Sequence, residues 1–456
     1  MELKPTEELA RFAAGFSYND LPPSAREHAH HLLLDSVACA IAGDYGDETA
    51  TYANFARLAG GTGDSTIIGS PDRLSLLGAS LLNGYLITTV TLCDTYLPAH
   101  VHITPEIVPP ALAVAERDGL DGRSLLAAIA LGAEVAVRVA SGIDYTVAGK
   151  RGWHFPGIVG PFGAAAAVGR LRGLSALQMR NAFGLAGSQA AGTWASWGTP
   201  AVKFHQSRGG ASGLLAGLLA EQDFAASAEI LAHPDGGIFA AYSDGGKPEA
   251  VTADLGSRYE FEQIALRLWP GATPAQSTLT AVFDMIESDR PPLDEIDNVR
   301  LDVAPHVYDA HARFTQPEGK FEALLSYHFM VAKVLRDGKL WLDSLSPEQV
   351  GDEALRRFMR ERIVLSRDPS LAFGKGRVTV TLKNGKVLKS YADAARGAPG
   401  NKASTGDFRA KYQQCVAGRL PSGEAEELFD RLMTIEELDD LGRVFTLLGA
   451  ARPRAH

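Results

Sequence analysis

Two short segments combine titratable side chains with proline or glycine beside apolar, helix-like runs. The first begins at Asp94 and reaches His102, so that an aspartate and two histidines fall within about nine residues. In the second, Lys150 to Gly157, His154 comes just before a predicted helix start, where an anion is favoured. Histidine titrates closest to neutral pH, so both segments indicate acid–base chemistry. The alternatives are a surface loop with incidental histidines and a helix-capping turn.

Two further segments offer cations. Lys203 and His205 follow a loop rich in Gly, Ser and Thr and precede a predicted helix of small residues. Lys203 is suited to bind a carboxylate or to stabilise an enolate, unless it is one more solvated lysine. Arg267 stands in Leu-Arg-Leu-Trp-Pro-Gly-Ala-Thr, where the helical pattern ends, and an interdomain crevice is a favoured ligand site. Taken alone, this last segment is a linker.

Several other kinds of site are not indicated. The sequence has no GxGxxG, P-loop, GxSxG or HExxH motif. Its three cysteines, Cys39, Cys93 and Cys415, are too few and too widely spaced for a disulfide framework or a thiolate cluster. Asp94, His102 and His154 lack compact metal-ligand spacing. We therefore expect no metal and no cofactor.

Composition limits the partners. The 456 residues carry a net charge of −10, with no Lys/Arg-rich run, so nucleic acid is not expected as a partner. An anionic substrate would need positive charge concentrated in a pocket. The N-terminal sequence is polar, and the most apolar stretch, Leu125–Ala140, contains Glu134 and Arg138 and reads as too short to span a bilayer. We expect a cytoplasmic protein without a membrane partner.

The chain is long enough for two domains. From Glu7 to about Asp223 its pattern is helical, and Gly163 to Ala167 predicts a closely packed central helix. The predicted helices are Ser24–Ala42, Leu77–Thr91, Pro109–Arg117, Gly122–Ser141, Phe162–Leu171, Ala176–Ala191 and Gly209–Gln222.

After Pro270 the pattern becomes mixed. Strands are predicted at Val299–Val303, Arg362–Ser366 and Arg377–Leu382, and Asn384-Gly385 predicts a type I′ hairpin. Helices are predicted around Glu322–Arg336 and Glu353–Glu361, and again over Asp407–Leu448. The fold class is therefore mostly α with a smaller α/β domain. We expect residues 1–266 plus 405–456 in the helical domain and 267–404 in the α/β domain.

These segments also occur, in this order, in the MmgE/PrpD family, which the chain resembles over most of its length. Gly152-Trp-His154-Phe-Pro-Gly157 is similar to the family's Gly-Phe/Trp-His-Pro-Thr-Gly, and Gly198 to Ala211 is similar to its Gly-Thr-x-x-Lys-x-x-His-x-Gly-x-Ala-Ala, with altered spacing. Asp94-Thr95 and His102-Ile-Thr resemble its Asp-rich loop and His-Pro-Ser. The resemblance implies an MmgE/PrpD-like two-domain architecture, a homodimer, and a cleft between the domains. It places four catalytic residues in that cleft: Asp94, His102, His154 and Lys203.

The sequence also departs from the family. Where relatives have Lys-x-Tyr-Pro-x-Cys followed by His, this chain has Arg267, Ala272 and Gln276. An arginine can clamp a carboxylate with two hydrogen bonds but cannot give up a proton near neutral pH. We assign substrate binding to Thr95, Tyr145, His205 and Arg267.

Together these features predict a cofactor-independent hydro-lyase, a dehydratase of a small hydroxylated di- or tricarboxylate such as a 2-methylcitrate-like acid. His102 or His154 would remove a proton beside a carboxylate, with Asp94 orienting an imidazole and Lys203 neutralising the developing charge. An epimerase of a dicarboxylate, as in the family's iminodisuccinate epimerase, begins with the same deprotonation, and Tyr145 could then return the proton. A decarboxylase of the cis-aconitate type and a non-catalytic binding protein are further alternatives.

Overall fold

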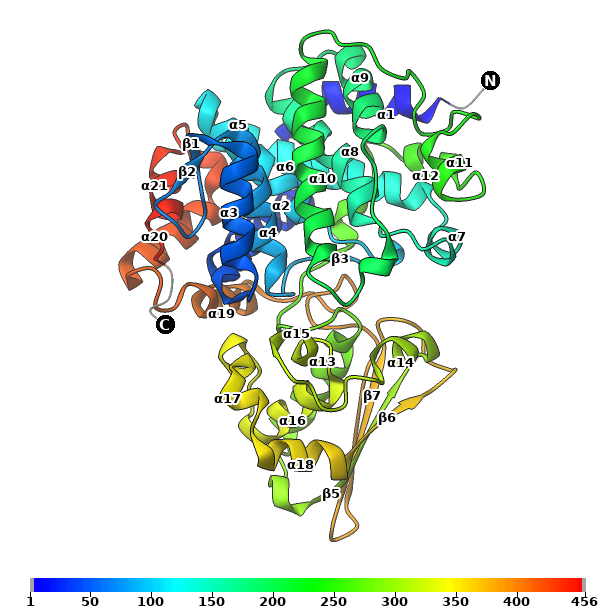
Figure 1. Ribbon diagram of the computed structural model, residues 1–456, viewed down its shortest axis with the longest axis vertical. Coiled ribbons are helices and arrows are strands. Elements are labelled where there is room, and N and C mark those ends of the chain that lie inside the picture. The colour runs from blue at the N-terminus through cyan, green and yellow to red at the C-terminus, as the bar shows by residue number, and fades with distance from the viewer. Residues whose placement is uncertain (1–3, 453–456) are drawn as a thin grey trace. The chain divides into compact units, whose positions relative to one another are not determined.

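A computed structural model describes residues 4–452, which form two compact units. Unit 1 comprises Met1–Ile264 and Phe408–His456, and unit 2 comprises Ala265–Asp407 (Figure 1). The sequence placed the divisions after residues 266 and 404. The C-terminal helices thus pack with the N-terminal part of the chain, and each unit has its own architecture.

Unit 1 is built almost entirely of helices. α6 (Gly122–Gly142), α8 (Pro156–Leu171) and α10 (Ala201–Ala220) lie at its centre, and α8 is buried from Pro156 to Gly169 (Figure 1). The other helices are α1 (Pro5–Gly15), α2 (Pro23–Ile41), α3 (Thr49–Gly60), α4 (Leu76–Thr89), α5 (Thr104–Asp118), α7 (Tyr145–Lys150), α9 (Ala176–Gly187), α11 (Ile238–Tyr242), α12 (Pro248–Thr252), α19 (Thr405–Val416), α20 (Ser422–Met433) and α21 (Gly442–Ala450).

Glycine lets the central helices approach closely. A Cβ added to Gly132 of α6 would lie 2.8 Å from the carbonyl oxygen of Gly163 in α8, and one added to Gly163 would lie 2.6 Å from that of Gly132. A Cβ on Gly213 of α10 would lie 2.3 Å from the side chain of Ala164. No side chain larger than hydrogen fits at these crossings, which confirms the prediction of a closely packed central helix.

α6 ends one residue later than the predicted helix Gly122–Ser141. Its 21 residues are long and apolar enough to cross a bilayer, so the expectation that this stretch is too short was wrong. Within unit 1, however, 94% of its most apolar window is buried. Glu134 and Arg138, both buried, form an ion pair along it at 2.5 Å. α6 therefore packs as a core helix.

Three helices begin five or more residues earlier than predicted, and one of them is α8, which begins at Pro156 rather than Phe162. α5 begins at Thr104 rather than Pro109, because a carboxylate caps its first turn and Pro105 is tolerated there, although Pro109 and Pro110 then lie inside the helix. α10 begins at Ala201 rather than Gly209. Lys203 and His205 consequently lie on the first turns of a helix instead of in a loop.

Unit 2 contains a four-stranded sheet with the order β6-β5-β7-β8. β5 pairs with β6 in parallel and with β7 antiparallel, for instance through Val299 and Val380, and β7 pairs with β8 antiparallel. Buried and partly exposed side chains alternate along β7, as in a sheet with one covered face. α13, α16 and α18 contact these strands. The prediction of an α/β region is confirmed.

The elements of unit 2 are α13 (Ala275–Ser288), β5 (Ile296–Val303), α14 (Pro305–His311), α15 (Lys320–Ala323), α16 (Tyr327–Asp337), α17 (Pro347–Val350), α18 (Glu353–Arg362), β6 (Ile363–Arg367), β7 (Gly376–Leu382) and β8 (Val387–Ala392). The predicted strands of unit 2 and α18 are confirmed, whereas α13, α14 and α17 were not predicted and the predicted helix around Glu322–Arg336 is divided into α15 and α16. The short strands β1 (Thr62–Thr66), β2 (Arg73–Leu74) and β3 (Thr95–Tyr96) belong to unit 1, and β4 (Ile264–Ala265) lies where the chain passes between the units.

The turn between β7 and β8 differs from the predicted type. Gly385 has φ of 86° and its N–H binds the carbonyl of Leu382 at 2.8 Å, while Asn384 is not among the residues with positive φ. A type I′ turn needs positive φ at both positions. The turn is therefore of type I, followed by a glycine in a bulge.

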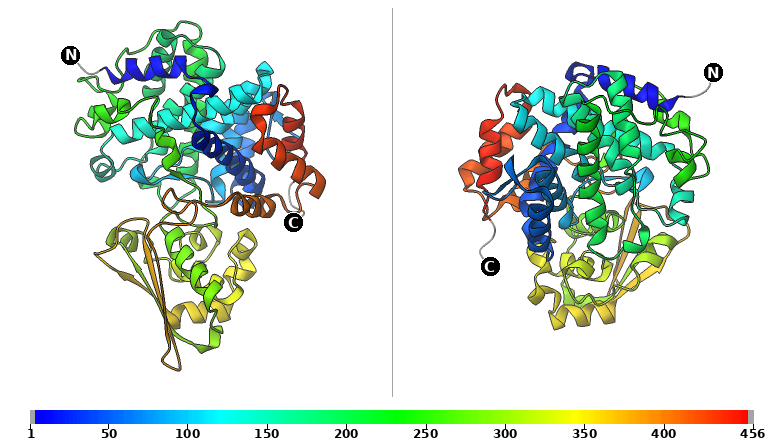
Figure 2. Two further views of the ribbon diagram at one scale, coloured as in Figure 1. Left: turned by 180° about the vertical axis from the view of Figure 1, so that it is seen from behind. Right: turned by 45° about the horizontal axis from the view of Figure 1, so that its top comes forward.

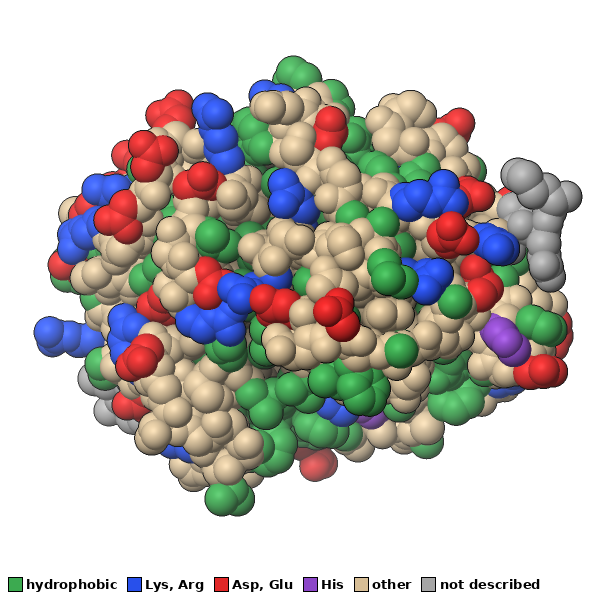
Figure 3. Space-filling model, turned by 90° about the horizontal axis from the view of Figure 1, so that it is seen from above, with side chains coloured by type: hydrophobic (Ala, Val, Ile, Leu, Met, Phe, Trp, Pro, Cys, Tyr) green, Lys and Arg blue, Asp and Glu red, His purple; other side chains and the backbone are tan. Residues whose placement is uncertain are grey.

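Charged side chains of both signs are interspersed over the face shown in Figure 3. Lys and Arg side chains lie next to Asp and Glu there, with apolar side chains between them. This face accordingly offers no continuous basic surface to a polyanion.

Candidate active site

Asp94 lies in the loop that joins α4 to α5 and is fully buried. Its carboxylate accepts hydrogen bonds from the N–H groups of Ile103 and Thr104 at 2.8 and 3.1 Å, and from the Thr104 hydroxyl at 2.6 Å. The N-terminus of a helix has unpaired N–H groups that favour an anion. Burial raises the pKa of Asp94 to about 6, although these hydrogen bonds oppose the rise. Asp94 thus ties the loop to the first turn of α5.

The imidazole of His102 contacts the backbone of Asp94. Nδ1 of His102 lies 2.7 Å from the Asp94 carbonyl oxygen and 3.3 Å from Oγ1 of Thr95, whose hydroxyl donates to the same carbonyl. Since a carbonyl only accepts, Nδ1 carries the proton, and a neutral ring then has its lone pair on Nε2. The backbone carbonyl of Asp94, and not its carboxylate as predicted, fixes this tautomer because the carboxylate is engaged by α5.

Two lysines hold the start of this loop. Thr91 has φ of 53°, which is strained for a β-branched residue. Lys203, on the first turn of α10, donates to the carbonyl of Thr89, and Lys411, on α19, donates to that of Leu92 at 2.9 Å. Both side chains are buried. The strained turn is therefore held on each side by an ammonium group from a different helix.

Lys411 also forms a buried ion pair with Asp35 of α2. The three cysteines, which the sequence analysis treated as scattered, all lie near this pair. Sγ of Cys39 is 3.7 Å from Asp35, and the charge of Lys411 acts on both Cys39 and Cys415, while Cys93 acts on Cys39. Burial raises the pKa of Cys39 well above its ordinary value and that of Cys415 to about 12. Such thiols are unreactive, so the cluster is structural.

His154 lies directly before α8, as predicted, and is 7% exposed. Its Nδ1 is 3.0 Å from Nδ1 of His205. One of these nitrogens must donate and the other accept, so the two rings share one proton between them. The ring that holds this proton has a basic Nε2, and the other ring has a protonated Nε2. The pair therefore offers one proton acceptor and one proton donor.

Burial keeps both rings of this pair neutral. It lowers the pKa of His154 to about 3, and the nearby His205 and His102 lower it further. Burial also lowers the pKa of His205, as does the guanidinium of Arg208. The three histidines thus occupy one neighbourhood of unit 1.

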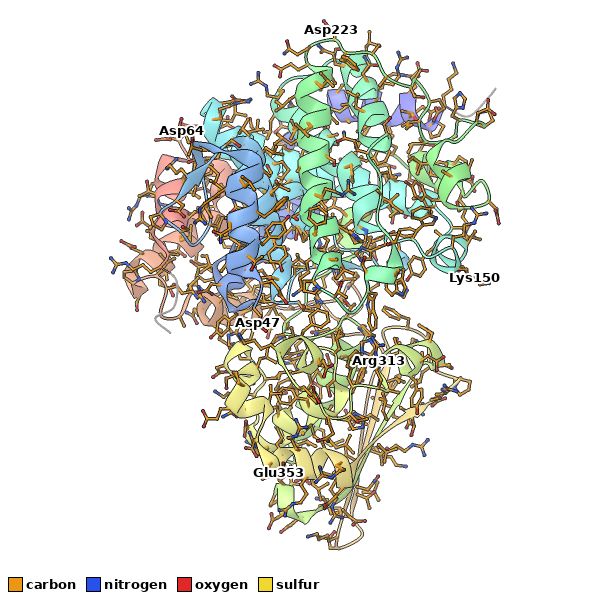
Figure 4. The ribbon with its side chains drawn as sticks, in the orientation of Figure 1. Asp47, Asp64, Lys150, Asp223, Arg313 and Glu353 are labelled. Atoms are coloured by element: carbon orange, nitrogen blue, oxygen red, sulfur yellow. The ribbon has the colours of Figure 1, made fainter. Side chains whose placement is uncertain are left out.

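Two other predicted residues lie at the margin of this group. Tyr145 stacks on His100, with ring centroids 4.5 Å apart, and contacts Phe155 at 5.2 Å. Burial raises the pKa of Tyr145. Lys150, which opens the predicted His154 segment, is exposed at the end of α7 (Figure 4).

Arg267 belongs to unit 2 and is buried there. Its guanidinium donates to the carbonyl of Gly271 at 3.2 Å. Gln276, which stands where the family has histidine, donates to the same carbonyl at 3.4 Å and to that of Trp269 at 3.0 Å. The cleft between domains and the role of Arg267 in it remain predictions.

The sequence analysis missed Glu106. This residue is fully buried, and neither carboxylate oxygen has a hydrogen-bond partner among residues 4–452. Its side chain packs against Gly160 of α8 and Gly209 of α10. Burial raises its pKa well above the ordinary 4.5, and the charge of Asp94 adds to the rise. Burial thus disfavours the charged form of Glu106, and a lone acidic residue in an apolar run was the only signal for it.

It also missed a tryptophan pair. Trp194 and Trp197 lie in the loop between α9 and α10, with stacked rings whose centroids are 5.9 Å apart. The Trp194 ring lies 5.8 Å from that of His154. The loop was noted for Lys203 alone. Within residues 4–452, no group of three or more His, Cys, Asp or Glu side chains is arranged to hold a metal ion.

Comparisons with known proteins cover nearly the whole chain. The model of the MmgE/PrpD N-terminal domain matches residues 7–251, and that of the MmgE/PrpD C-terminal domain matches residues 269–434. The chain is 24% identical to a cis-aconitate decarboxylase-like protein of Aspergillus oryzae, over 97% of both chains. It is also 24% identical to the cis-aconitate decarboxylases of Aspergillus terreus and Homo sapiens, over 97% and 98% of this chain and 95% of each relative.

Proposed function

The chain belongs to the MmgE/PrpD family, and from this premise we propose that it is a lyase that moves a proton at a carbon beside a carboxylate of a small polycarboxylic acid. Its own side chains act as acid and base, without a cofactor. The observation that carries the proposal is the proton shared by His154 and His205, next to the tautomer fixed at His102. The first candidate reaction is dehydration of a hydroxylated di- or tricarboxylate.

His102 is the proposed base. Its Nδ1 proton is held by the Asp94 carbonyl, so Nε2 is the basic nitrogen of the neutral ring and is the proposed acceptor of the proton from carbon. Removal of that proton places negative charge on the neighbouring carboxylate, in an enediolate. The ammonium of Lys203 contributes positive charge at this stage.

The histidine pair is the proposed acid. Whichever ring has the protonated Nε2 gives that proton to the leaving hydroxyl, which departs as water. The proton between the two Nδ1 atoms can then shift to that ring, and Nε2 of the other ring takes up the proton removed by His102, through solvent, which restores a neutral pair with its donor at the opposite end. Because both rings are neutral, this transfer needs no prior protonation from solvent.

Decarboxylation is the second candidate, since the names of the relatives favour it. In that reaction the C–C bond to a carboxylate breaks, carbon dioxide leaves, and the remaining carbanion takes a proton from the histidine pair. The two reactions differ in the bond that breaks, C–H in one and C–C in the other, and in both negative charge develops on carbon.

The test is incubation of the purified protein in D₂O with a panel of hydroxylated and unsaturated di- and tricarboxylates, followed by NMR. Dehydration would yield a new vinylic signal without loss of carbon, and decarboxylation would release carbon dioxide and place deuterium on the product. Exchange without net product would favour an epimerase. An absence of both exchange and product across the panel, with ligand binding intact, would contradict catalysis.

We also propose that the protein is a homodimer and that it works in the cytoplasm. Exposed apolar side chains support the dimer: Phe55 and Leu58 lie on α3, and Phe204, Leu215 and Leu219 lie on α10. The rings of Phe55 and Phe204 are 6.1 Å apart, and α3 and α10 run side by side in both Figure 1 and the right-hand view of Figure 2. Size-exclusion chromatography with light scattering should show a dimer that Leu58→Asp together with Leu219→Asp converts to a monomer.

A further inference from the structure

An exposed tryptophan stands beside the buried histidine pair. Trp194 is 43% exposed, although its side chain is among the largest apolar groups, and its ring packs face to face with that of Trp197 at an interplanar angle of 15°. Leaving this much apolar surface in water is unfavourable. A position next to the proposed acid suggests that the surface serves a ligand.

Backbone contacts fix the tryptophan loop to the His154 segment. The N–H of His154 donates to the carbonyl of Gly192 at 3.1 Å, and the N–H of Trp194 donates to the carbonyl of Gly152 at 2.7 Å. Trp153 and Thr193 form an antiparallel bridge between these two bonds. Trp194 is therefore held in place relative to His154 by a short ladder, and not by side-chain packing alone.

Gly192 brings this loop against the imidazoles themselves. It has φ of 149°, which L side chains rarely adopt. A Cβ there would lie 3.1 Å from Nδ1 of His205 and 3.2 Å from the carbonyl oxygen of His154. The loop backbone thus passes directly over the histidine pair, two residues before the exposed indole.

Arg208, the cation that contacts this loop, is already hydrogen-bonded within the protein. The guanidinium of Arg208 donates to the carbonyls of Gln189, Gly157 and Ala191 at 2.9, 3.2 and 2.8 Å, and to the hydroxyl of Ser212 at 3.3 Å. Arg208 holds the same loop, so few of its N–H groups remain to bind a carboxylate of a ligand. The side of the histidine pair that faces Trp194 is accordingly aromatic in character.

We propose that Trp194, backed by Trp197, is a subsite for a flat apolar substituent, such as an aryl group, on the carboxylic acid whose reacting carbon lies at His154. The inference rests on the proposed function and narrows it. The substrate then has a carboxylate beside the reacting carbon and an apolar arm, instead of being a fully polar citrate-like acid. Offset stacking on an indole suits such an arm.

The test uses two probes on the full chain, succinate and 2-phenylsuccinate, with affinities measured by isothermal titration calorimetry. The wild type should bind phenylsuccinate about tenfold more tightly, the scale of one good aromatic contact. Trp194→Ala should abolish that preference while changing succinate affinity less than about twofold. Trp194→Phe, which keeps a ring, should retain most of the preference. Leu177→Ala, at another exposed apolar residue, on α9, is the matched control and should change neither affinity.

Equal binding of the two probes by the wild type would overturn the proposal, as would a parallel loss of both affinities in Trp194→Ala. A change of oligomeric state in Trp194→Ala with the preference intact would mean that the indole covers a protein surface, which also overturns it. His154→Ala should keep the phenylsuccinate preference and lose turnover. If the preference is present but no acid of the panel exchanges deuterium in the wild type, the subsite stands and the proposed lyase function fails.

Discussion

Two loops of unit 1 meet at the histidines, and they are built in opposite ways. The loop from Val90 to Ile103 is mostly buried, and the buried carboxylate of Asp94 and two buried ammonium groups hold it. The loop from Ser188 to Pro200 is rich in glycine and aromatic side chains and is largely exposed. Hydrogen bonds of the first loop fix one tautomer of His102. The second leaves apolar surface beside His154. The difference suggests that one loop positions the base and the other receives the substrate.

The largest expected effect is at the imidazoles. His102→Asn and His154→Ala should each lower turnover at least about 100-fold, since each removes a positioned acid or base. His233→Ala, at an exposed histidine, is the control and should leave turnover unchanged. Near-normal turnover in purified, folded His154→Ala would show that the second loop takes no part in the reaction. Lys203→Ala should cause a similar loss, accompanied by loss of stability because the Thr89 carbonyl loses its donor.

The next prediction separates the effect of Lys411 on turnover, through the first loop, from its effect on the free energy of unfolding. Lys411→Met alone should lower the free energy of unfolding by about 3–5 kcal/mol, because it leaves the Asp35 carboxylate buried without its cation. Replacing both, as Asp35→Leu with Lys411→Met, should restore most of that stability, measured by urea denaturation.

Activity should not return with stability in this double variant. The Leu92 carbonyl still lacks its donor, so the strained turn at Thr91 should relax and kcat should remain about tenfold below wild type. If kcat recovers together with stability, the ion pair serves the core alone, and the first loop needs no support from α19.

The pH dependence of the histidine pair tests the second loop. With the pKa of His154 lowered to about 3, its ring should stay neutral from pH 5 to 8. Nitrogen-15 NMR of histidine-labelled protein should show no titration of His154 in that range. Protonation of His154 near pH 6 would show that water enters the pair freely.

The smallest expected effect is on the pH dependence of stability and concerns Glu106. Its pKa is raised in the fold, so the folded state keeps a proton that the unfolded chain releases above pH 4.5, and the free energy of unfolding falls as pH rises from there. Glu106→Gln cannot release that proton. The stability of the variant relative to wild type should therefore improve as pH rises, in thermal melts from pH 4.5 to 8, with turnover within about twofold. A pH-independent difference would mean that the carboxyl is already ionised.

The sequence predicted the long helices and the strands well, because their apolar periodicity is local. It placed the start of α10 too late, since Gly, Ser and Thr before Lys203 are typical of a loop, and only packing against α4 and α8 makes the segment helical. The proton shared by His154 and His205 could not be predicted, because it depends on a 3.0 Å approach between residues 51 positions apart. The sequence also could not predict that the Asp94 carboxylate caps α5. The N–H group that it binds, that of Ile103, lies nine positions later, and such capping is not a local pattern.

The contact between Lys411 and Asp35 joins residues 376 positions apart. A ribosome therefore delivers Asp35, Asp94 and the three histidines of the site, His102, His154 and His205, long before the ammonium of Lys411 that steadies the turn at Thr91. Until α19 has been synthesised, the Asp35 carboxylate must remain hydrated or protonated, and the core around it cannot pack fully. Nascent chains that stop after unit 2 should therefore be protease-sensitive and inert, however complete their N-terminal helices.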